Sequence, residues 1–529
     1  MTRKLSIILL FLILIIAVFF RFWQLDKIPP GLYPDVAMNG NNALDAIKTG
    51  DYKVFYPENN GREGLFMNLI AMSFLTFGAS VWAMKIVAAL FGLFTVLGTY
   101  FLTRQLFRYL ENESAADVIA LLAAFFMAVS FWHVNFSRIG FRAIMVPFFL
   151  VWALYFLFKA FNSQNSRSEI LNFALSGVAF GLGFHTYIAF RIAPLIAVPI
   201  FVIWIIKNRP KFRVLPWMIL IIFALAAASP LLYYYIKNPA DFMGRAGQVS
   251  IFASGNVVKT LLQSTVKTLG QFVAVGDYNW RHNLSGSPEI FWPLIPFFLT
   301  GLIYSLVQIF KKRNYTEHNY TLLSVHWTLI FAWGAMILPS IATGEGLPHA
   351  LRSIGAIVPS YIFTGLGFWW VTDKMRFQKA MFKGTLISVF LLAVLFLSYW
   401  LYFIDWAKNP NVQGAFTQQF VDEAQYLNAL PTNIQKYVIV NEDGVPVPYP
   451  GGIPMPAQTI IFQTRIHQPE TEVTFLKTDE VSKLPSCQRC IAAILPMKYD
   501  DNLISHLKQK YPGGKIENLG NYSVFKIGF

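Results

Sequence analysis

Long apolar stretches are the feature that most limits what this chain can fold into. An α-helix rises 1.5 Å per residue, so about 17–25 consecutive apolar residues cross the hydrocarbon core of a bilayer. Only 13% of the residues are charged, against about 25% in soluble domains. The sequence therefore predicts an all-α polytopic membrane protein with about 11 transmembrane helices. These stretches cover residues 5–22, 81–103, 115–134, 143–161, 169–188, 191–206, 214–236, 290–310, 322–341, 351–371 and 384–404.

The net charge of +15 follows membrane topology and gives no reason to expect a nucleic-acid partner. Most of the excess lysines and arginines fall in short loops between apolar stretches, and such loops face the cytoplasm. Nearly all compact basic clusters share one side if residues 65–78, which are apolar but short, do not cross. No small-residue cleavage site follows the first stretch, so it is expected to be a retained helix. We therefore expect a multi-pass protein of the cell (plasma) membrane with a cytoplasmic amino terminus.

Residues 405–529 differ in character from the rest of the chain. Short strand-like and helix-like segments alternate there, which is typical of a small α/β domain. Helical patterns occupy 416–431 and 500–514, and strand patterns occupy 436–442, 458–464, 490–496 and 522–528. We therefore expect a transmembrane domain at 1–404, with a first external loop at 23–80, and an extracytoplasmic α/β domain at 405–529.

Two cysteines stand close together in the segment SCQRC, at positions 487 and 490. A structural zinc site of the cysteine type usually needs a second pair with similar spacing. The chain has only two cysteines, which argues against such a site. A local disulfide between Cys487 and Cys490 and a pair of idle thiols both remain open.

The loop at 23–80 carries a carboxylate in an unusual place. Asp35 lies in the segment YPDVA, just after Pro34 and before a helical pattern. One interpretation is a helix N-cap, because aspartate accepts hydrogen bonds from the first free N–H groups of a helix. The other is a general base or a metal-binding carboxylate at an external active site, and the two are compatible. Further along, Arg62 and Glu63 form either an interfacial charge pair or, through Arg62, a phosphate contact.

Three other predicted external segments carry cationic side chains close to the bilayer. Such groups are costly there unless they pair or bind an anion, although long side chains can also reach lipid headgroups. The repetition on one face suggests a pocket for an anionic, lipid-attached ligand. The candidates are His133, Arg138 and Arg142 in FWHVNFSRIGFR, His185, Tyr187 and Arg191 in FHTYIAFR, and Glu345, His349 and Arg352 in GEGLPHALRS.

Over residues 1–370, the ordered combination of segments resembles a known family. The chain resembles polytopic membrane glycosyltransferases of the GT-C type, and among them the protein mannosyltransferase and aminoarabinose transferase branch (glycosyltransferase families 39 and 83). The segments are LYPDVAMNGNNALDAIKTGDY, NGREGLFMNLIAMSFLTFGASVWAMKIVAALFGLFTVLGTYFL, SFWHVNFSRIGFRAIMVPFFLVWALYFL and LPHALRSIGAIVPSY.

The resemblance implies a reaction and roles for individual residues. Members of the family transfer a sugar from a polyprenyl-phosphate donor to an acceptor outside the cytoplasm, usually with inversion. Asp35 occupies the place of the family's catalytic carboxylate, and Arg62 occupies that of a phosphate-binding residue. Two departures are visible: Val36 stands where relatives often have glutamate, and no acid occurs in RAIMVPFF. Asp35 alone, or with Glu63 or Glu345, is then the carboxylate set, and use of a divalent metal ion stays open.

The physical requirements of that reaction fit an external site. Nucleotide sugars are made in the cytoplasm, so an external enzyme needs a donor that the membrane delivers. Guanidinium groups stabilise the charge that develops on the lipid phosphate, and the candidates in order are Arg62, Arg142, Arg138, Arg191 and Arg352. The acceptor can be a protein, a lipid or a glycan. The alternatives are a transporter or lipid flippase, against which no inverted repeat is visible, and a structural or sensor protein.

Overall fold

The computed structural model divides into two compact units. The first comprises Met1–Leu25 and Lys85–Ala407, and the second comprises Asp26–Met84 and Lys408–Phe529. By its contacts, most of the loop at 23–80 therefore belongs with the C-terminal residues. Cys487 and Cys490 lie outside the described residues. The structure describes residues 2–110, 113–207, 213–253, 256–311, 317–375, 380–444, 452–467, 472–485 and 491–528.

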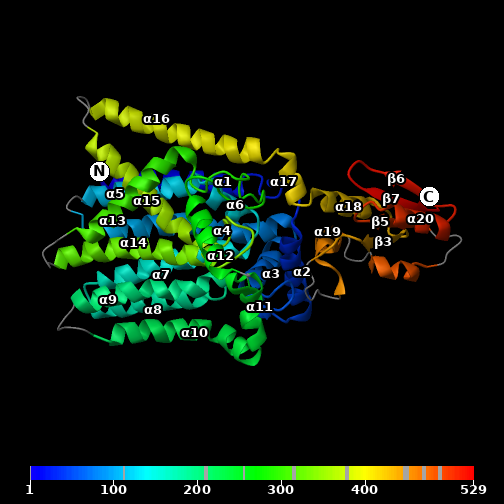
Figure 1. The fold of residues 1–529 in the computed structure, drawn as a ribbon, viewed down its shortest axis with the longest axis horizontal. Coiled ribbons are helices and arrows are strands. Elements are labelled where there is room, and N and C mark those ends of the chain that lie inside the picture. Colours follow the sequence, from blue (N-terminus) through cyan, green and yellow to red (C-terminus); the bar gives the residue numbers. More distant parts are fainter. Residues whose placement is uncertain are drawn as a thin grey trace. The chain divides into compact units, whose positions relative to one another are not determined.

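The first unit is a bundle of apolar helices (Figure 1). Among the described residues, nine helices are long and apolar enough to cross a membrane, and the pair α5–α6, bent by 56°, adds a tenth. This confirms the predicted polytopic helical fold. The helices are α1 (Arg3–Phe22), α4 (Val81–Phe107), α5 (Glu113–Val129), α6 (Phe131–Arg138), α7 (Met145–Phe161), α8 (Ser166–Gly183), α9 (Ala197–Lys207), α10 (Leu215–Lys237), α13 (Ile295–Phe310), α14 (Glu317–Ile341), α15 (Ile357–Lys374) and α16 (Ala380–Tyr399).

Shorter elements connect these helices on the first unit. Several spans begin with a 3₁₀ turn, and α16 continues into a π-helical turn. Residues 257–270 form the helix α12. These connecting elements are η1 (Arg142–Ile144), η2 (Ile188–Ile196), α11 (Pro239–Val249), η3 (Ile251–Ala253), α12 (Val257–Gly270), η4 (Trp292–Leu294), η5 (Ile354–Ala356) and η6 (Trp400–Trp406).

The helix α8 corresponds to the predicted span 169–188, and it is not among the ten candidate spans. Its 18 residues include a polar first turn with Arg167 and Glu169, which lowers its mean hydropathy. Figure 1 shows α8 alongside α7 and α10, both of which it contacts. A Cβ at Gly177 would lie 2.3 Å from Leu220 O, and one at Gly181 would lie 2.3 Å from Ala224 O. These two glycines therefore let α8 and α10 approach closely, as small residues do between membrane helices.

The second unit contains a five-stranded sheet with helices on both faces (Figure 1). The strand order is β4-β3-β5-β7-β6; β3 pairs in parallel with β4 and β5, and β7 pairs antiparallel with β5 and β6. The strands are β3 (Gln435–Val440), β4 (Val473–Lys477), β5 (Ala492–Pro496), β6 (Lys515–Asn518) and β7 (Ser523–Ile527), and the helices are α17 (Pro410–Ala415), α18 (Gln418–Ala429), η8 (Met455–Ala457), α19 (Gln458–His467), η9 (Thr478–Lys483) and α20 (Asp501–Lys510).

Alternate residues of the central strands fill two cores. Val438 and Leu495 pack with residues of α18 and α19 on one face, whereas Ile439 and Ile494 pack with residues of α20 on the other. This period of two is what a sheet covered on both faces requires. The small C-terminal α/β fold is thus confirmed.

One element of that domain was predicted wrongly. The segment 458–464 is the helix α19 and not a strand. Its apolar run reads like a short strand, but Ile460 packs into the sheet core while Phe462 packs beside Gly40 and Phe74 of the first loop. Burial on two sides explains the continuous apolar run, which periodicity alone cannot assign. The strands β4 and β6 were not predicted.

The loop at 23–80 completes the second unit by packing against α19. Asn41 Nδ2 donates to both Gln458 O and Gln458 Oε1, at 3.1 and 3.0 Å, and Thr459 Oγ1 donates to Leu32 O at 2.8 Å. These buried hydrogen bonds join segments more than 400 residues apart in the sequence. The loop elements are α2 (Pro34–Thr49), β1 (Phe55–Tyr56), β2 (Arg62–Glu63) and α3 (Leu65–Phe77).

This packing constrains the number of crossings. Because α2 contacts α19, both lie on the same side of the membrane, so an even number of crossings separates them. Of the ten candidate spans, α1 precedes α2, so nine lie between α2 and α19. Counting α8 as a further span raises the number of crossings between α2 and α19 to ten, which is even. The alternative, α3, has 13 residues and is about 20 Å long, too short for a ~30 Å hydrocarbon core.

Candidate active site

One face of α2 carries the predicted catalytic carboxylate. Asp35, Asn39 and Asn42 stand at spacings of four and three residues, which places them on the same helical face. The helix begins at Pro34 with Tyr33 at the N-cap position and no side-chain capping bond. Asp35 is thus the second helical residue and not the N-cap. Its half-buried carboxylate lies in the first turn, where the helix dipole favours negative charge.

A tight turn places an amide against this carboxylate. Asn59 Nδ2 donates to Asp35 Oδ1 at 2.8 Å. Asn59, Asn60 and Gly61 all have left-handed backbone, with φ of 53°, 65° and 81°. Asparagine and glycine are the residues that adopt this conformation at least cost, so the sequence ENNG suits the turn. Local strain of this kind is often found at functional sites.

Arg62 is buried behind the same helical face. Its exposed fraction is 2%; Nη1 donates to Asn39 Oδ1 at 2.8 Å and Nη2 donates to Asn42 Oδ1 at 2.7 Å. The guanidinium also lies 5.8 Å from the centre of the Tyr56 ring. In this geometry, Arg62 fixes the two asparagines, and through them the face that carries Asp35. Phosphate binding by Arg62 stays a prediction.

The hairpin of β1 and β2 holds Arg62 in place. Tyr56 pairs with Arg62 and Phe55 pairs with Glu63, and Glu63 is buried. Burial raises the pKa of the Tyr56 hydroxyl to about 12, although the nearby Arg62 charge opposes the increase. Tyr56 is therefore neutral under physiological conditions and presents an uncharged ring to the guanidinium.

The other predicted residues belong to the first unit. One of them, Arg138, donates to carbonyl groups at the C-terminal end of α1. Its Nη1 donates to Phe20 O at 3.0 Å, and its Nη2 donates to Trp23 O at 2.7 Å and Gln24 O at 3.1 Å. The last carbonyls of a helix have no partner within that helix. The fully buried Arg138 therefore caps α1, and this role accounts for a charge at that depth.

Arg191 and Arg352 also donate to backbone carbonyls. Arg191 Nη1 donates to Phe242 O at 2.6 Å, and its Nη2 donates to Tyr235 Oη at 3.0 Å. Arg352 Nη1 donates to Glu345 O at 2.8 Å and to Thr343 Oγ1 at 2.8 Å, which closes its own loop. The Glu345 side chain is exposed. Both arginines thus stabilise local structure in the first unit.

Arg142 lies over an aromatic ring, as Arg191 also does. It is half-exposed, and its guanidinium lies 5.5 Å from the centre of the buried Tyr187 ring. The structure thus brings two predicted residues together, since Arg142 comes from η1 and Tyr187 precedes η2. A cation that lies over an aromatic ring is attracted by the negative face of the ring.

The predicted histidines occupy three separate positions. His133 Nδ1 lies 2.6 Å from Arg21 Nη2 inside the bundle, and His185 Nε2 lies 3.0 Å from Ala227 O. His349 instead lies in a cluster with Asp277 and His282. Asp277 and His282 were not predicted from the sequence, although the segment GDYNWRHN places a carboxylate and an imidazole five residues apart on one loop.

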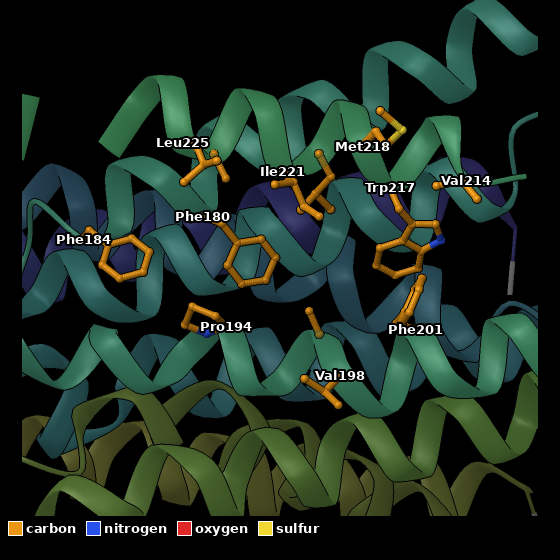
Figure 2. A pocket seen from close by; sticks show the side chains of 13 residues that line it. Phe180, Phe184, Pro194, Val198, Phe201, Val214, Trp217, Met218, Ile221 and Leu225 are labelled. Carbon is orange, nitrogen blue, oxygen red and sulfur yellow. The ribbon is translucent and has the colours of Figure 1, made fainter. Parts of the chain in front are cut away.

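The described part of the first unit also contains an apolar cavity of about 480 Å³. Figure 2 shows Phe180 and Phe184 of the α8 region beside Pro194, Val198 and Phe201. Side chains of α10 complete the lining, among them Trp217, Ile221 and Leu225 (Figure 2). The lining is almost wholly hydrocarbon, so the cavity suits an apolar chain.

Comparisons with known proteins agree with this architecture. Residues 65–234, 170 of the 529, match the dolichyl-phosphate-mannose-protein mannosyltransferase family. The structure of ArnT from Cupriavidus metallidurans bound to undecaprenyl phosphate matches with a TM-score of 0.57 at 13% identity, covering 98% of each chain. None of the curated proteins matches the sequence.

A second solved structure supports the same fold. The archaeal oligosaccharyltransferase AglB from Archaeoglobus fulgidus, in complex with an inhibitory peptide and a dolichol-phosphate, matches with a TM-score of 0.50 at 15% identity. That match covers 82% of this chain and 62% of AglB. The resemblance predicted from the sequence is therefore confirmed: the chain has the fold of the GT-C-type membrane glycosyltransferases.

Proposed function

We propose that the chain transfers a sugar from a polyprenyl-phosphate donor to an acceptor at the external face of the membrane, with inversion at the anomeric carbon. The observation that carries the proposal is the polar face of α2, where Asn59 orients Asp35 beside the asparagines that bind Arg62. This face is built on a fold shared with a protein that binds undecaprenyl phosphate.

Asp35 acts as the general base in this proposal. The acceptor hydroxyl loses a proton as its oxygen attacks the anomeric carbon, and a half-buried carboxylate with one fixed oxygen is suited to accept it. A positioned base contributes about 10²–10⁴-fold to the rate. The bond to the phosphate oxygen breaks in the same step, and the negative charge passes to the lipid phosphate.

Arginine then stabilises the charge on the leaving phosphate. Among the predicted arginines, Arg142 and Arg191 both combine partial exposure with an aromatic support, whereas Arg138 donates to the end of α1. We propose Arg142 as the first phosphate contact, because it precedes Arg191 in the order predicted from the sequence, with Arg62 holding α2. The apolar cavity between α8 and α10 is chemically suited to the isoprenoid tail, and a polyprenyl chain keeps its phosphate at the surface.

The proposed orientation follows from charge and packing together. The second unit contains both the first loop and the C-terminal domain, so one assignment fixes the side of both. The positive-inside rule puts them outside. Cysteine labelling of intact cells should then modify a cysteine introduced near residue 35 and leave one near residue 311 unmodified.

The decisive experiment compares two aspartates of the same helix. Membranes that contain the chain receive a panel of radiolabelled polyprenyl-phosphate sugars, and label is followed into protein, lipid and glycan fractions. Asp35→Asn should lower transfer by at least 100-fold. The matched control is Asp45→Asn, because the exposed Asp45 forms a surface ion pair with Arg465 at 2.6 Å and should keep the parent rate.

Each outcome has a distinct meaning. Transfer by Asp35→Asn at the parent rate contradicts the assignment of the base. Label that crosses the membrane but stays on its carrier supports the flippase alternative, since a flippase moves the lipid without breaking the sugar–phosphate bond. The labelled fraction also identifies the acceptor class, and the sugar that is consumed identifies the donor.

A further inference from the structure

Two loops of the first unit bring a carboxylate and two imidazoles together. Asp277 and His282 lie on the loop between α12 and η4, and His349 lies between α14 and η5. One possible ligand atom from each residue lies within 4.8 Å of the others. Both His282 and Asp277 are buried, and His349 is partly buried. This cluster has no part in the transfer step proposed above.

We propose that Asp277, His282 and His349 bind one divalent transition-metal ion, with Zn²⁺ as the representative. Zinc binds histidine nitrogen and carboxylate oxygen at about 2.0–2.2 Å, so neighbouring ligands of a tetrahedral site lie about 3.3 Å apart. Asp277 Oδ2 lies 2.9 Å from His282 Nδ1 and 3.7 Å from His349 Nδ1. These two distances bracket the required value, and possible ligand atoms of all three residues lie within 4.8 Å of one another, so side-chain rotations can bring the three around one ion.

A hydrogen bond between His282 and Asp277 does not by itself account for the position of the His349 ring. His282 Nδ1 is close enough to donate to Asp277 Oδ2, but the 3.7 Å separation from His349 Nδ1 is too long for a hydrogen bond. Two imidazole rings, with centres 5.0 Å apart, nevertheless face one carboxylate oxygen. One metal ion placed between these three groups can bind both nitrogens and the carboxylate.

Backbone groups of both loops fix the carboxylate. Ala350 N donates to Asp277 Oδ2 at 2.9 Å, and Asn279 N donates to Asp277 Oδ1 at 2.8 Å. The His282 ring stacks on Phe136 with centres 5.7 Å apart. Such outer contacts hold metal ligands in their orientation. These contacts therefore orient the carboxylate and the His282 ring before any ion binds.

The ligand set also indicates which ions fit. Two imidazoles and one carboxylate suit Zn²⁺, Fe²⁺ or Mn²⁺, whereas Mg²⁺ and Ca²⁺ prefer oxygen ligands. Three protein ligands leave one position of a tetrahedral zinc site open to water or to an anionic oxygen. A bound ion would also link the two loops, and it would stabilise the first unit by mass action.

The test measures metal binding by the full chain, purified in detergent without a polyhistidine tag and stripped with a chelator. Zn²⁺ and Co²⁺ are titrated by calorimetry and by Co²⁺ ligand-field absorption, and metal content is measured after dialysis. We expect one ion per chain and a thermal stabilisation on binding. Asp277→Asn, His282→Ala and His349→Gln should each weaken binding by at least 10-fold.

The control and the contrary result are equally definite. His506→Ala removes an exposed histidine of α20 and should leave affinity and stoichiometry unchanged. His349→Gln acts at the least buried ligand, so it tests the site even if a variant at a buried position does not fold. Binding that is absent, or that survives all three ligand variants, overturns the proposal. No sugar donor is present, so this result is independent of the transfer assay.

Discussion

The α2 face of the second unit and the arginine-bearing loops of the first unit use similar residues in opposite ways. On α2, polar side chains bind one another: Arg62 donates to Asn39 and Asn42, and Asn59 donates to Asp35. In the first unit, Arg138 donates to backbone carbonyls at the end of a helix. One arrangement orients a carboxylate that stays half-exposed, whereas the other satisfies the main chain.

The difference teaches how to interpret cationic residues near a bilayer. An arginine in such a place can bind an anionic ligand, but it can equally complete the hydrogen bonding of a helix end, where water is scarce. The discriminating property is the acceptor of its N–H groups, together with its exposure. By exposure, the half-exposed Arg142 and Arg191 differ from the buried Arg138 and Arg352. Two measurements test this division among the arginines, and two more compare residues within the second unit.

The largest expected effect is on stability and comes from Arg138→Ala. The substitution removes a buried cation and leaves the carbonyls of Phe20, Trp23 and Gln24 without their charged donor. Hydrogen bonds to charged groups contribute about 1.5–3 kcal/mol each, so a loss of about 3 kcal/mol in the free energy of unfolding is expected. Thermal unfolding in detergent measures it. An unchanged unfolding temperature would show that Arg138 is not a cap.

The second effect is on catalysis and comes from Arg142→Ala. We expect a decrease in the transfer rate of about 10²-fold, because removing one donor to a developing charge has an effect of this order. The unfolding temperature should stay near that of the parent. Arg142→Lys keeps the charge and should recover part of the rate. If Arg142→Ala instead lowers the unfolding temperature as much as Arg138→Ala does and keeps the parent rate of transfer, the contrast between Arg142 and Arg138 is lost.

The third effect compares two links between α2 and α19. Asn41→Ala leaves Gln458 without its buried partner and should cost about 1 kcal/mol or slightly more. Asp45→Asn breaks the exposed ion pair with Arg465, and exposed pairs contribute about 0.2–1 kcal/mol. Chemical denaturation of the two variants should rank Asn41→Ala as the more destabilised. The reverse order would mean that the exposed pair holds the loop.

The smallest expected effect concerns a second carboxylate of the second unit. Glu423 in α18 is fully buried, and burial raises its pKa well above the ordinary value. Folding therefore favours the neutral acid, and stability falls as the pH rises above the carboxyl's unfolded pKa of about 4.5. Glu423→Gln should remove that slope and leave stability at acidic pH unchanged. Denaturation midpoints between acidic and neutral pH give the slope.

The matched control for this test is the neighbouring residue. Asp422→Asn changes a half-exposed carboxylate that accepts from Gln418 Nε2 and Asn521 Nδ2, so it should keep the parent slope above the unfolded pKa. An identical slope in Glu423→Gln and the parent chain would place the titrating group elsewhere. The contrast with Asp35 is then complete: one carboxylate is buried and neutral, and the other stays half-exposed.

The sequence by itself determined the bundle and much of the C-terminal domain. Apolar runs long enough to cross a bilayer are local properties, so ten of the predicted spans coincide with candidate spans of the structure. The pattern at 436–442 predicted β3 correctly, because a short apolar run rich in β-branched residues is also a local property. The resemblance through Asp35 and its neighbours likewise depended on short segments.

Only the tertiary structure decided which side chains meet. The helix α19 was read as a strand because its apolar run serves two partners, the sheet and α2. Asp277, His282 and His349 converge from two loops about 70 residues apart, and no local pattern reveals that distance. The roles of Arg138 and Arg142 also depend on which acceptor or ring folding brings to each one. Long-range packing fixes such contacts, and a sequence read segment by segment contains no record of them.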